Sequence, residues 1–520
     1  MNQQLHKKAI ITKTLQVGAA TLLSRVIAIF REVLMVQFLG IGAMSDAFIA
    51  AFRFPNIFRH VFAEGALSAS FIPVYVKALK QHERKDADGL MTATMLFVEG
   101  CIIIFYAFIL LFPRAVVLFI APGFSAEQVE HTALFLKILF PFLAFVSASA
   151  LLGGALNAVN QFFIPAIGPA VWNILYVASI GCCMYFDLAT SFLCIGVLVA
   201  GVVQFSISLF TYFGYEMAFR SITPVAKKLF QLVLSKFFPC LFGVSIIEIN
   251  LLVSGQIASF LPRGSVSLLY YGSRFMNLPL GVFGVALSNI LLPHFSRIAL
   301  FAPSRFNFYL LKVAKFVTWV MVPVAVLFMI ASEQLFAMIF MVSKKATLDQ
   351  VMQAKWILII YCMGLVFFAF NKILLSFFYS LKDTSSATIA SAIAAAINLS
   401  VDLVSLYFNN IYGIAAATVA SGVGMTIVSL YFLHTRHNIS FFAARYLEFL
   451  IKFFTQFALI AGIFSILFYG SEALLGSLWQ DSKLWSILIF WIRFSVASII
   501  CAYLHYTTRH FFKIKLHFID

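Results

Sequence analysis

Long apolar runs recur from one end of the chain to the other, separated by short polar, proline-containing or glycine-containing breaks. A helix needs about 20 residues to cross the hydrocarbon core of a bilayer, so these runs predict about fourteen transmembrane helices. Runs of this length exclude a membrane barrel, whose strands are short and alternate in polarity. The predicted helices are centred near Ile27, Phe54, Ile104, Phe142, Ile174, Val199, Leu251, Gly284, Val322, Leu365, Ala394, Val419, Ile460 and Phe494.

The composition agrees with this pattern. The 520 residues are 62% hydrophobic and 11% charged, against roughly 45 to 50% and 25% in soluble domains. We therefore expect an all-α polytopic membrane protein without a separate water-soluble domain. The net charge of +16 would suggest nucleic acid in a soluble protein, but here we expect no nucleic-acid partner and attribute the charge to loops that face anionic lipid.

Basic residues gather in alternate loops, after the second, sixth, eighth and twelfth predicted helices, and in both tails. Lysine and arginine accumulate on the cytoplasmic side of membrane proteins, so both termini are predicted to be cytoplasmic. Lys344 and Lys345 are exceptions to this alternation.

The sequence contains an internal repeat. The stretch Arg53–Pro73, RFPNIFRHVFAEGALSASFIP, is echoed by Arg274–Pro293, RFMNLPLGVFGVALSNILLP, about 220 residues later. The repeat divides the first twelve helices into two lobes of six with the same orientation, which predicts an axis along the membrane normal, as in alternating-access transporters. The predicted lobes are residues 1–220 and 221–440, followed by two additional helices in residues 441–520.

Prolines and charged residues mark the repeated helices as unusual. Pro55 and Pro279 lie within them and predict kinked helices with protein or water nearby. Each charge at membrane depth costs roughly 2.5 to 3.5 kcal/mol on insertion scales. The charged residues of the first two apolar runs are Arg25, Arg31, Glu32, Asp46, Arg53, Arg59, His60 and Glu64.

These charges allow two interpretations. They either form internal salt bridges, such as Arg25 or Arg31 with Glu32 or Asp46 and Arg59 with Glu64, or they line a wet cavity that holds a charged ligand. Arginine outnumbers the carboxylates, and arginine binds phosphate in a bidentate geometry that lysine cannot supply. The excess favours an anionic ligand with a phosphate or pyrophosphate group.

A series of motifs extends over the chain: SR-x4-FRE, SDAF, F-x-FPN-x2-R, FAEGA-x-S-x2-F-x-P, GSVS-x3-Y-x2-R and LPLGVFGVALS-x2-LLP. With them the sequence resembles the MurJ (MviN) family of the multidrug/oligosaccharidyl-lipid/polysaccharide (MOP) exporter superfamily. The resemblance implies the MOP transporter fold and a lipid II flippase of the bacterial cytoplasmic membrane. Such a flippase carries the undecaprenyl-pyrophosphate-linked peptidoglycan precursor to the periplasmic leaflet.

The resemblance also implies a site. The family's cavity arginines match Arg25, Arg31, Arg59 and Arg274, beside Ser24, and would bind the substrate. Its gating or cavity acids match Asp46 and Glu64, with Glu32 where many relatives have aspartate. Further departures from the family pattern are His60, Ser273 and Asn277. The family further implies membrane lipids and a cell-wall synthesis complex as partners.

A second candidate site lies in the eleventh and twelfth predicted helices. Asn398 and Asp402 are one turn apart, and Thr418 lies in the next helix. Oxygen ligands of this kind suit a hard cation such as Na⁺, and some members of the family have a sodium site of this form. A hydrogen-bonded helix contact explains the same residues, and coupling to H⁺ or to the membrane potential is equally open.

Other function classes are less well supported. An exporter of another cargo, either a drug or a polysaccharide-linked lipid, shares the architecture, but a cavity for cationic drugs should be lined by acids and aromatic residues. A non-transporting scaffold of cell-wall synthesis would not need arginines at membrane depth. No catalytic, nucleotide-binding or cofactor-binding motif is present, so we expect neither an enzyme nor a resident cofactor.

Overall fold

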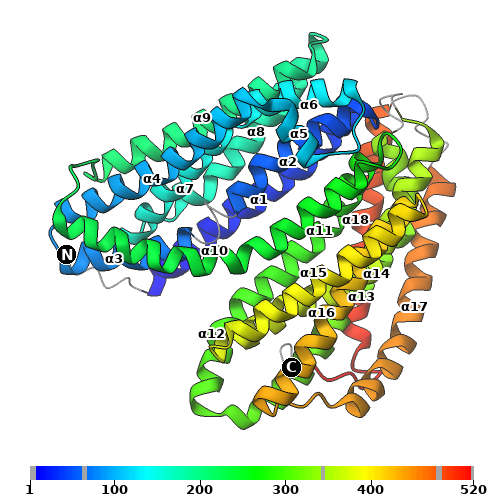
Figure 1. Ribbon diagram of the computed structural model, residues 1–520. Coiled ribbons are helices and arrows are strands. Elements are labelled where there is room, and N and C mark those ends of the chain that lie inside the picture. The colour runs from blue at the N-terminus through cyan, green and yellow to red at the C-terminus, as the bar shows by residue number, and fades with distance from the viewer. Residues whose placement is uncertain (1–6, 61–66, 341–345, 476–482, 517–520) are drawn as a thin grey trace. The chain divides into compact units, whose positions relative to one another are not determined.

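The computed structural model describes residues 7–60, 67–340, 346–475 and 483–516. Within these ranges every regular element is a helix, which confirms the predicted all-α class. The contacts divide the chain into two compact units, Met1–Ser267 and Leu268–Asp520. The helices of both are shown in Figure 1.

The first unit is built from ten helices and the start of an eleventh. The long helix α1 packs along α8, and α8 packs in turn against α9, while α10 packs against α3 and α4. Their bounds are α1 Lys7–Leu39, α2 Ala43–Arg59, α3 Leu67–Gln81, α4 Arg84–Leu111, α5 Pro113–Ile120, α6 Ala126–Leu139, α7 Phe142–Ala158, α8 Phe163–Tyr185, α9 Thr190–Gly214, α10 Pro224–Ala258 and α11 Ser265–Pro279.

The second unit continues from α11. Helices α13 and α14, α14 and α16, and α15 and α16 pack against one another, and α17 and α18 form a pair beside α13. The bounds are a π-helical turn Leu280–Gly284, α12 Val285–Phe301, a 3₁₀ turn Pro303–Arg305, α13 Phe306–Phe340, α14 Leu348–Ser380, α15 Thr384–Tyr407, α16 Ile411–His437, α17 Ala443–Leu475 and α18 Lys483–Thr508.

Each of the fourteen predicted centres falls within a described helical element. Ten helices in the described ranges are long and apolar enough to cross a membrane, so the protein is a multi-pass membrane protein. The count of fourteen spans stays a prediction. Helices α1, α2 and α11, which carry the candidate site, are not among the ten.

Helix ends follow local chemistry. Phe112 lies between α4 and Pro113, the first residue of α5, and Pro141 separates α6 from α7, because proline lacks the N–H that the preceding helix would require. Ser125 caps α6 and Thr347 caps α14, each in a capping box with the glutamine three residues on.

The second copy of the repeat departs from a regular helix at its proline. In the second copy, α11 ends at Pro279 and a π-helical turn separates it from α12. In the first copy, α2 contains Pro55 and ends at Arg59, and α3 begins at Leu67. Residues 61–66, between α2 and α3, lie outside the described residues.

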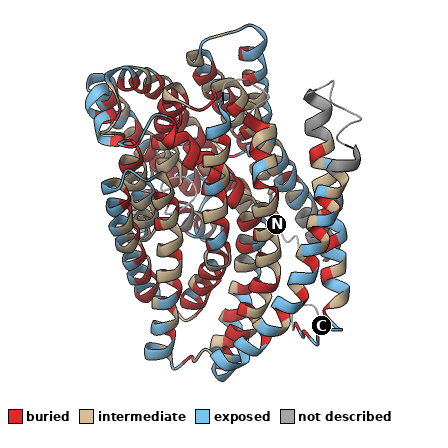
Figure 2. Ribbon diagram, turned by 90° about the vertical axis from the view of Figure 1, so that its right-hand side faces the viewer, coloured by how far each residue is buried: buried red, intermediate tan, exposed pale blue. Residues whose placement is uncertain are grey.

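Large apolar side chains lie exposed on the outer faces of the helices. Ile104 on α4 is 71% exposed, Phe210 on α9 is 74% exposed and Ile466 on α17 is 74% exposed. Figure 2 shows that exposed positions run along the helices while buried ones gather where helices face one another. Exposed apolar surface on this scale is expected where lipid, not water, surrounds the protein.

The contact boundary lies between Ser267 and Leu268, whereas the repeat places the lobe boundary near residue 220. The difference arises from α10, which belongs to the second lobe by sequence but packs against α3 and α4. The predicted division into residues 1–220, 221–440 and 441–520 describes the symmetry of the chain and stays a prediction.

One charged cluster lies between helices of the second unit. Asp383 caps α15: its carboxylate accepts hydrogen bonds from the Ser386 N–H at 2.9 Å, the Ser386 hydroxyl at 2.5 Å and His437 Nε2 at 2.8 Å. Burial alone would raise the pKa of Asp383, but the bonds from Ser386 and His437 outweigh it and lower that pKa to about 2.

We expect Asp383→Ala to lower the free energy of unfolding at pH 7 by about 1 kcal/mol, the usual loss for an N-cap. Because the folded-state pKa lies below the ordinary value of 3.8, the stabilisation is present above pH 4 and disappears as the pH falls toward 2. Thermal melts of the purified protein at several pH values measure this difference. Asp349→Ala, at an exposed site on α14, is the control. If the stability lost in Asp383→Ala became larger in acid, the assignment of Asp383 as a cap with a lowered pKa would be wrong.

Candidate functional site

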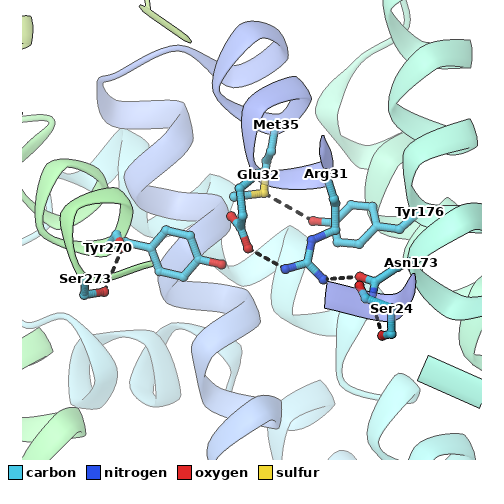
Figure 3. Close-up of polar contacts among 8 residues, drawn as sticks. All are labelled: Ser24, Arg31, Glu32, Met35, Asn173, Tyr176, Tyr270 and Ser273. Atoms are coloured by element: carbon cyan, nitrogen blue, oxygen red, sulfur yellow. Dashed lines mark hydrogen bonds and ion pairs between the residues drawn. The ribbon is translucent and has the colours of Figure 1, made fainter. Parts of the chain in front are cut away.

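Arg31 lies buried on α1 in a shell of polar and aromatic groups. Its Nη1 donates to Asn173 Oδ1 at 2.7 Å, and its Nη2 forms an ion pair with Glu32. The guanidinium carbon lies 5.1 Å from the Trp172 ring centroid and 5.2 Å from that of Tyr176. Figure 3 shows the guanidinium held between Glu32 and Asn173. Charge, hydrogen bonds and ring faces together compensate for its removal from water.

Asn173 connects this shell to a second predicted residue. Its amide Nδ2 lies 3.2 Å from the Ser24 hydroxyl oxygen, two turns before Arg31 on α1. One turn after Arg31, the Tyr176 hydroxyl donates to Met35 Sδ at 3.4 Å. Ser24, Arg31 and Met35 therefore form one face of α1, at i, i+7 and i+11, directed at α8.

The partners on α8 are fixed by an aromatic cluster. Phe52 of α2 stacks on Trp172 with ring centroids 6.3 Å apart and planes 8° apart, and Phe142 of α7 lies 5.5 Å from Trp172. Trp172 also packs edge-on against Tyr176 at 5.2 Å. Helices α2, α7 and α8 thus support the rings on which Arg31 lies.

Asp46 has a different role from the one its charge suggests. It is buried on α2, and its carboxylate accepts hydrogen bonds from the backbone N–H groups of Gly264, at 2.6 Å, and Ser267, at 2.8 Å, and from the Ser267 hydroxyl at 2.8 Å. These are the otherwise unsatisfied donors at the start of α11. Within the described residues Asp46 forms no ion pair with an arginine; it caps a helix from outside.

Two other predicted arginines of the first unit are less buried than Arg31. Arg59, at the end of α2 and partly buried, donates from Nε to Asn56 Oδ1 at 2.9 Å and lies 3.2 Å from His60 Nε2. Arg25 on α1 is also partly exposed. Glu64, predicted to pair with Arg59, lies outside the described residues.

Arg274 belongs to the second unit and lies on α11. Its guanidinium carbon is 4.5 Å from the Tyr270 ring centroid, one turn earlier on the same helix. Ser273 and Asn277, the departures from the family pattern, donate to the backbone carbonyls of Tyr270 and Ser273 respectively. The convergence of Arg274 with the arginines of the first unit stays a prediction.

The candidate cation site lies wholly in the second unit. Asn398 is 1% exposed and Asp402 is 0% exposed on α15, and α15 packs against α16. On α16 the Thr418 hydroxyl lies 3.4 Å from the Ile414 carbonyl oxygen. The buried carboxylate and amide thus lie on a helix packed against the one that carries Thr418, and the sodium site stays a prediction.

The sequence analysis missed Trp172, Asn173 and Tyr176. Their signal was present, because asparagine inside an apolar run is costly to place in a membrane and the aromatic residues one position before and three after it complete one face of the helix. What the sequence lacks is the partner: Asn173 and Arg31 are 142 residues apart.

Comparison with known proteins places this arrangement in a family. The sequence model of the lipid II flippase MurJ matches residues 35–480. The chain belongs to the MurJ family. The probable lipid II flippase MurJ of Rhizobium tropici is 32% identical over 441 residues, which cover 80% of this chain and 79% of the relative. That of Vibrio cholerae serotype O1 is 31% identical over 433 residues, 79% of this chain and 80% of the relative.

Solved structures agree on the fold. A structure of lipid II flippase MurJ in an inward closed conformation matches with a TM-score of 0.76 at 24% identity, over 95% of this chain and 99% of that one. An inward-facing multidrug resistance MATE transporter of the MOP superfamily matches with a TM-score of 0.65 at 13% identity, over 80% of this chain and 94% of that one. This MurJ-family protein therefore has the MOP transporter fold expected from its motifs.

In this MurJ-family protein, Asn173→Ala should weaken the association of α1 with α8. The change removes the amide that bridges Arg31 and Ser24 and leaves part of a buried guanidinium without its acceptor, which costs about 1 to 3 kcal/mol. A lower thermal midpoint of the purified protein is the expected result. Asn277→Ala, which removes an exposed amide bonded only to its own helix turn, is the control and should leave the midpoint unchanged. Equal midpoints for both variants would refute the bridging role.

Proposed function

We propose that this protein is a lipid II flippase. It moves the undecaprenyl-pyrophosphate-linked disaccharide-pentapeptide from the cytoplasmic to the periplasmic leaflet of the bacterial cytoplasmic membrane, for peptidoglycan synthesis. The proposal is supported by membership of the MurJ family and by relatives of similar length that bear that name. In this proposal both termini are cytoplasmic, the protein is a carrier and not an enzyme, and lipid II is its principal partner beside membrane lipids and a cell-wall synthesis complex.

The excess of guanidinium groups on α1 and α2 carries the proposal. Arg25, Arg31 and Arg59 lie on these helices, and Arg31 pairs with Glu32. The carboxylate of Asp46 accepts hydrogen bonds from the start of α11. A positive excess in an apolar helix bundle is stabilised by an anionic ligand, and a pyrophosphate offers several oxygens for bidentate contacts.

The arginines have different tasks in this proposal. Arg31 is held by four groups and fixes the local charge and the position of α1 on α8. Arg25 and Arg59 are more exposed and can turn toward a ligand, so we assign them direct contacts with the pyrophosphate or the adjacent sugar. Arg274 completes the set from the second lobe. The prenyl tail stays in lipid while the lobes alternate access to the two leaflets.

Arg25→Ala should abolish transport with normal protein levels in the membrane. Arg25→Lys should fail as well, because an ammonium cannot bind a phosphate with two parallel N–H groups. The measurement is complementation of a strain depleted of its own flippase, together with cleavage of lipid II by an enzyme added from the periplasmic side.

The control is Arg305→Ala, at an exposed position of the 3₁₀ turn before α13, which should restore lipid II exposure fully. A functional Arg25→Ala protein would show that Arg25 is not part of the substrate site. Unchanged exposure of lipid II after depletion of the wild-type protein, with no second flippase present, would overturn the cargo assignment.

We also propose that Asn398, Asp402 and Thr418 bind Na⁺ and couple the carrier to an ion gradient. A buried carboxylate with amide and hydroxyl oxygens nearby suits a hard monovalent cation. Coupling to protons or to the membrane potential are the alternatives.

Asp402→Asn keeps the shape of the side chain and removes its charge, so it should abolish sodium-dependent transport. Lipid II exposure in cells or vesicles with and without a sodium gradient is the measurement, and Asn398→Asp, which keeps an oxygen ligand, should retain part of the sodium dependence. If wild-type transport does not respond to sodium, or if Asp402→Asn leaves the response unchanged, the site is a helix contact only.

A further inference from the structure

A groove on the first unit carries charge of the opposite sign to that of the arginines on α1 and α2. It encloses about 460 Å³ between α4, α7 and α9. Four phenylalanines line it: Phe145 from α7, Phe205 and Phe213 from α9, and Phe219 from the following loop. Among the described residues that line it, Glu99 of α4 is the one that is charged. A volume of this size lies within the usual range for small-molecule sites, roughly 300 to 1,000 Å³.

Glu99 is a carboxylate in the middle of a helix that is long and apolar enough to cross a membrane. Its Oε1 is buried, and within the described part of the chain this oxygen has no hydrogen-bond partner. A carboxylate in such surroundings costs several kcal/mol unless a cation or a proton neutralises it. None of the described residues that line the groove is basic.

The groups packed around Glu99 are apolar. Those from α7 are Ala144, Phe145 and Ala148, and those from α9 are Phe205, Leu209 and Phe213. The other acids of α4 are occupied near its start: Asp86 accepts from the Thr223 hydroxyl at 2.5 Å, and Asp88 pairs with Arg220 at 3.3 Å. Glu99 is therefore the charged group that dominates the groove.

The groove reaches the level of the loop between α9 and α10. Thr92 and Phe219 form part of its wall, and the Arg220 N–H donates to the Thr92 hydroxyl at 3.1 Å. Glu99 lies two turns further along α4, about 10 Å from Thr92 at 1.5 Å per residue. A ligand that partitions into the part of the bilayer near this loop can enter the groove and reach Glu99.

Phenyl rings and a carboxylate together favour one ligand chemistry. Ring faces attract organic cations through their quadrupole, and this attraction grows when water is excluded. A carboxylate in the same hollow adds a full counter-charge. The arginines on α1 and α2 are positively charged, so they repel a cation.

We propose that this groove is a binding site for lipophilic organic cations, with Glu99 as the counter-ion and the four phenylalanines as its aromatic wall. The site is separate from the arginines on α1 and α2 and does not depend on the proposed transport of lipid II.

The test uses the full-length protein in nanodiscs and radiolabelled tetraphenylphosphonium as the probe, with empty nanodiscs as the blank for partition into lipid. We expect one saturable site. Glu99→Gln, which removes the charge and keeps the shape, should weaken binding at least about tenfold, and Phe205→Leu, which removes one ring face, about threefold. Because only the ionised carboxylate attracts the cation, wild-type affinity should fall between pH 8 and pH 5 while that of Glu99→Gln stays flat.

Glu333→Gln, which neutralises an exposed carboxylate paired with Lys355 in the second unit, is the matched control and should bind like wild type. Glu99→Asp keeps the charge and should keep the pH dependence, which separates lost charge from misfolding. The proposal is overturned if the protein binds no more probe than empty nanodiscs do. It is also overturned if Glu99→Gln binds as tightly as wild type, or if wild-type affinity does not depend on pH. Either of these last two results would leave Glu99 as a proton site or a lipid-facing acid. Arg25→Ala should bind the probe normally, so failure of the flippase assignment is distinguishable from failure of this one.

Discussion

The burial of one guanidinium group organises the first unit. Arg31 cannot leave water without compensation, and the protein supplies it from two helices: a carboxylate from the next residue of α1, and an amide and two ring faces from α8. Breaking a buried set of this kind by removing one partner is far more costly than the net stability that the set contributes. Helices α1 and α8 are therefore bound to move together, and the charge of Arg31 stays at a fixed place in the bundle.

The sequence located the long helices but not their partners, and it did not predict the short helix α5. Apolar runs located the helices because burial in lipid requires an unbroken apolar length, and Pro279 marked a break because its ring and missing N–H act locally. The charge of Arg31 was equally visible. The pairing of Arg31 with Asn173, 142 residues away, and of Asp46 with the Gly264 N–H, 218 residues away, could not be predicted, because the packing of distant helices leaves no local signal.

Asp46 shows why this gap affects function. Counted from the sequence, it is one of the acids available to pair with arginine. In the structure its oxygens accept from the start of α11 and hold that helix in place, a role that a count of charges does not show. Glu99 lies in a separate groove on α4 with no basic residue among the described residues of its lining, so the two signs of charge do not cancel. The proposed anion site and the proposed cation site are compatible within one unit, because apolar side chains of α4, α7 and α9 make up most of the lining around Glu99.

The fixed start of α11 has a mechanical consequence for Arg274. The carboxylate of Asp46 holds the first turn of the helix, and Arg274 lies two turns further on. The π-helical turn Leu280–Gly284 follows directly after Pro279, and such turns weaken the regular hydrogen-bond ladder at one point. Bending of the α11–α12 segment is therefore concentrated beyond Arg274 and not before it. In the proposed carrier, Arg274 would keep its position relative to the start of α11 while α12 changes direction, so access would change without disrupting the proposed ligand contacts of this helix.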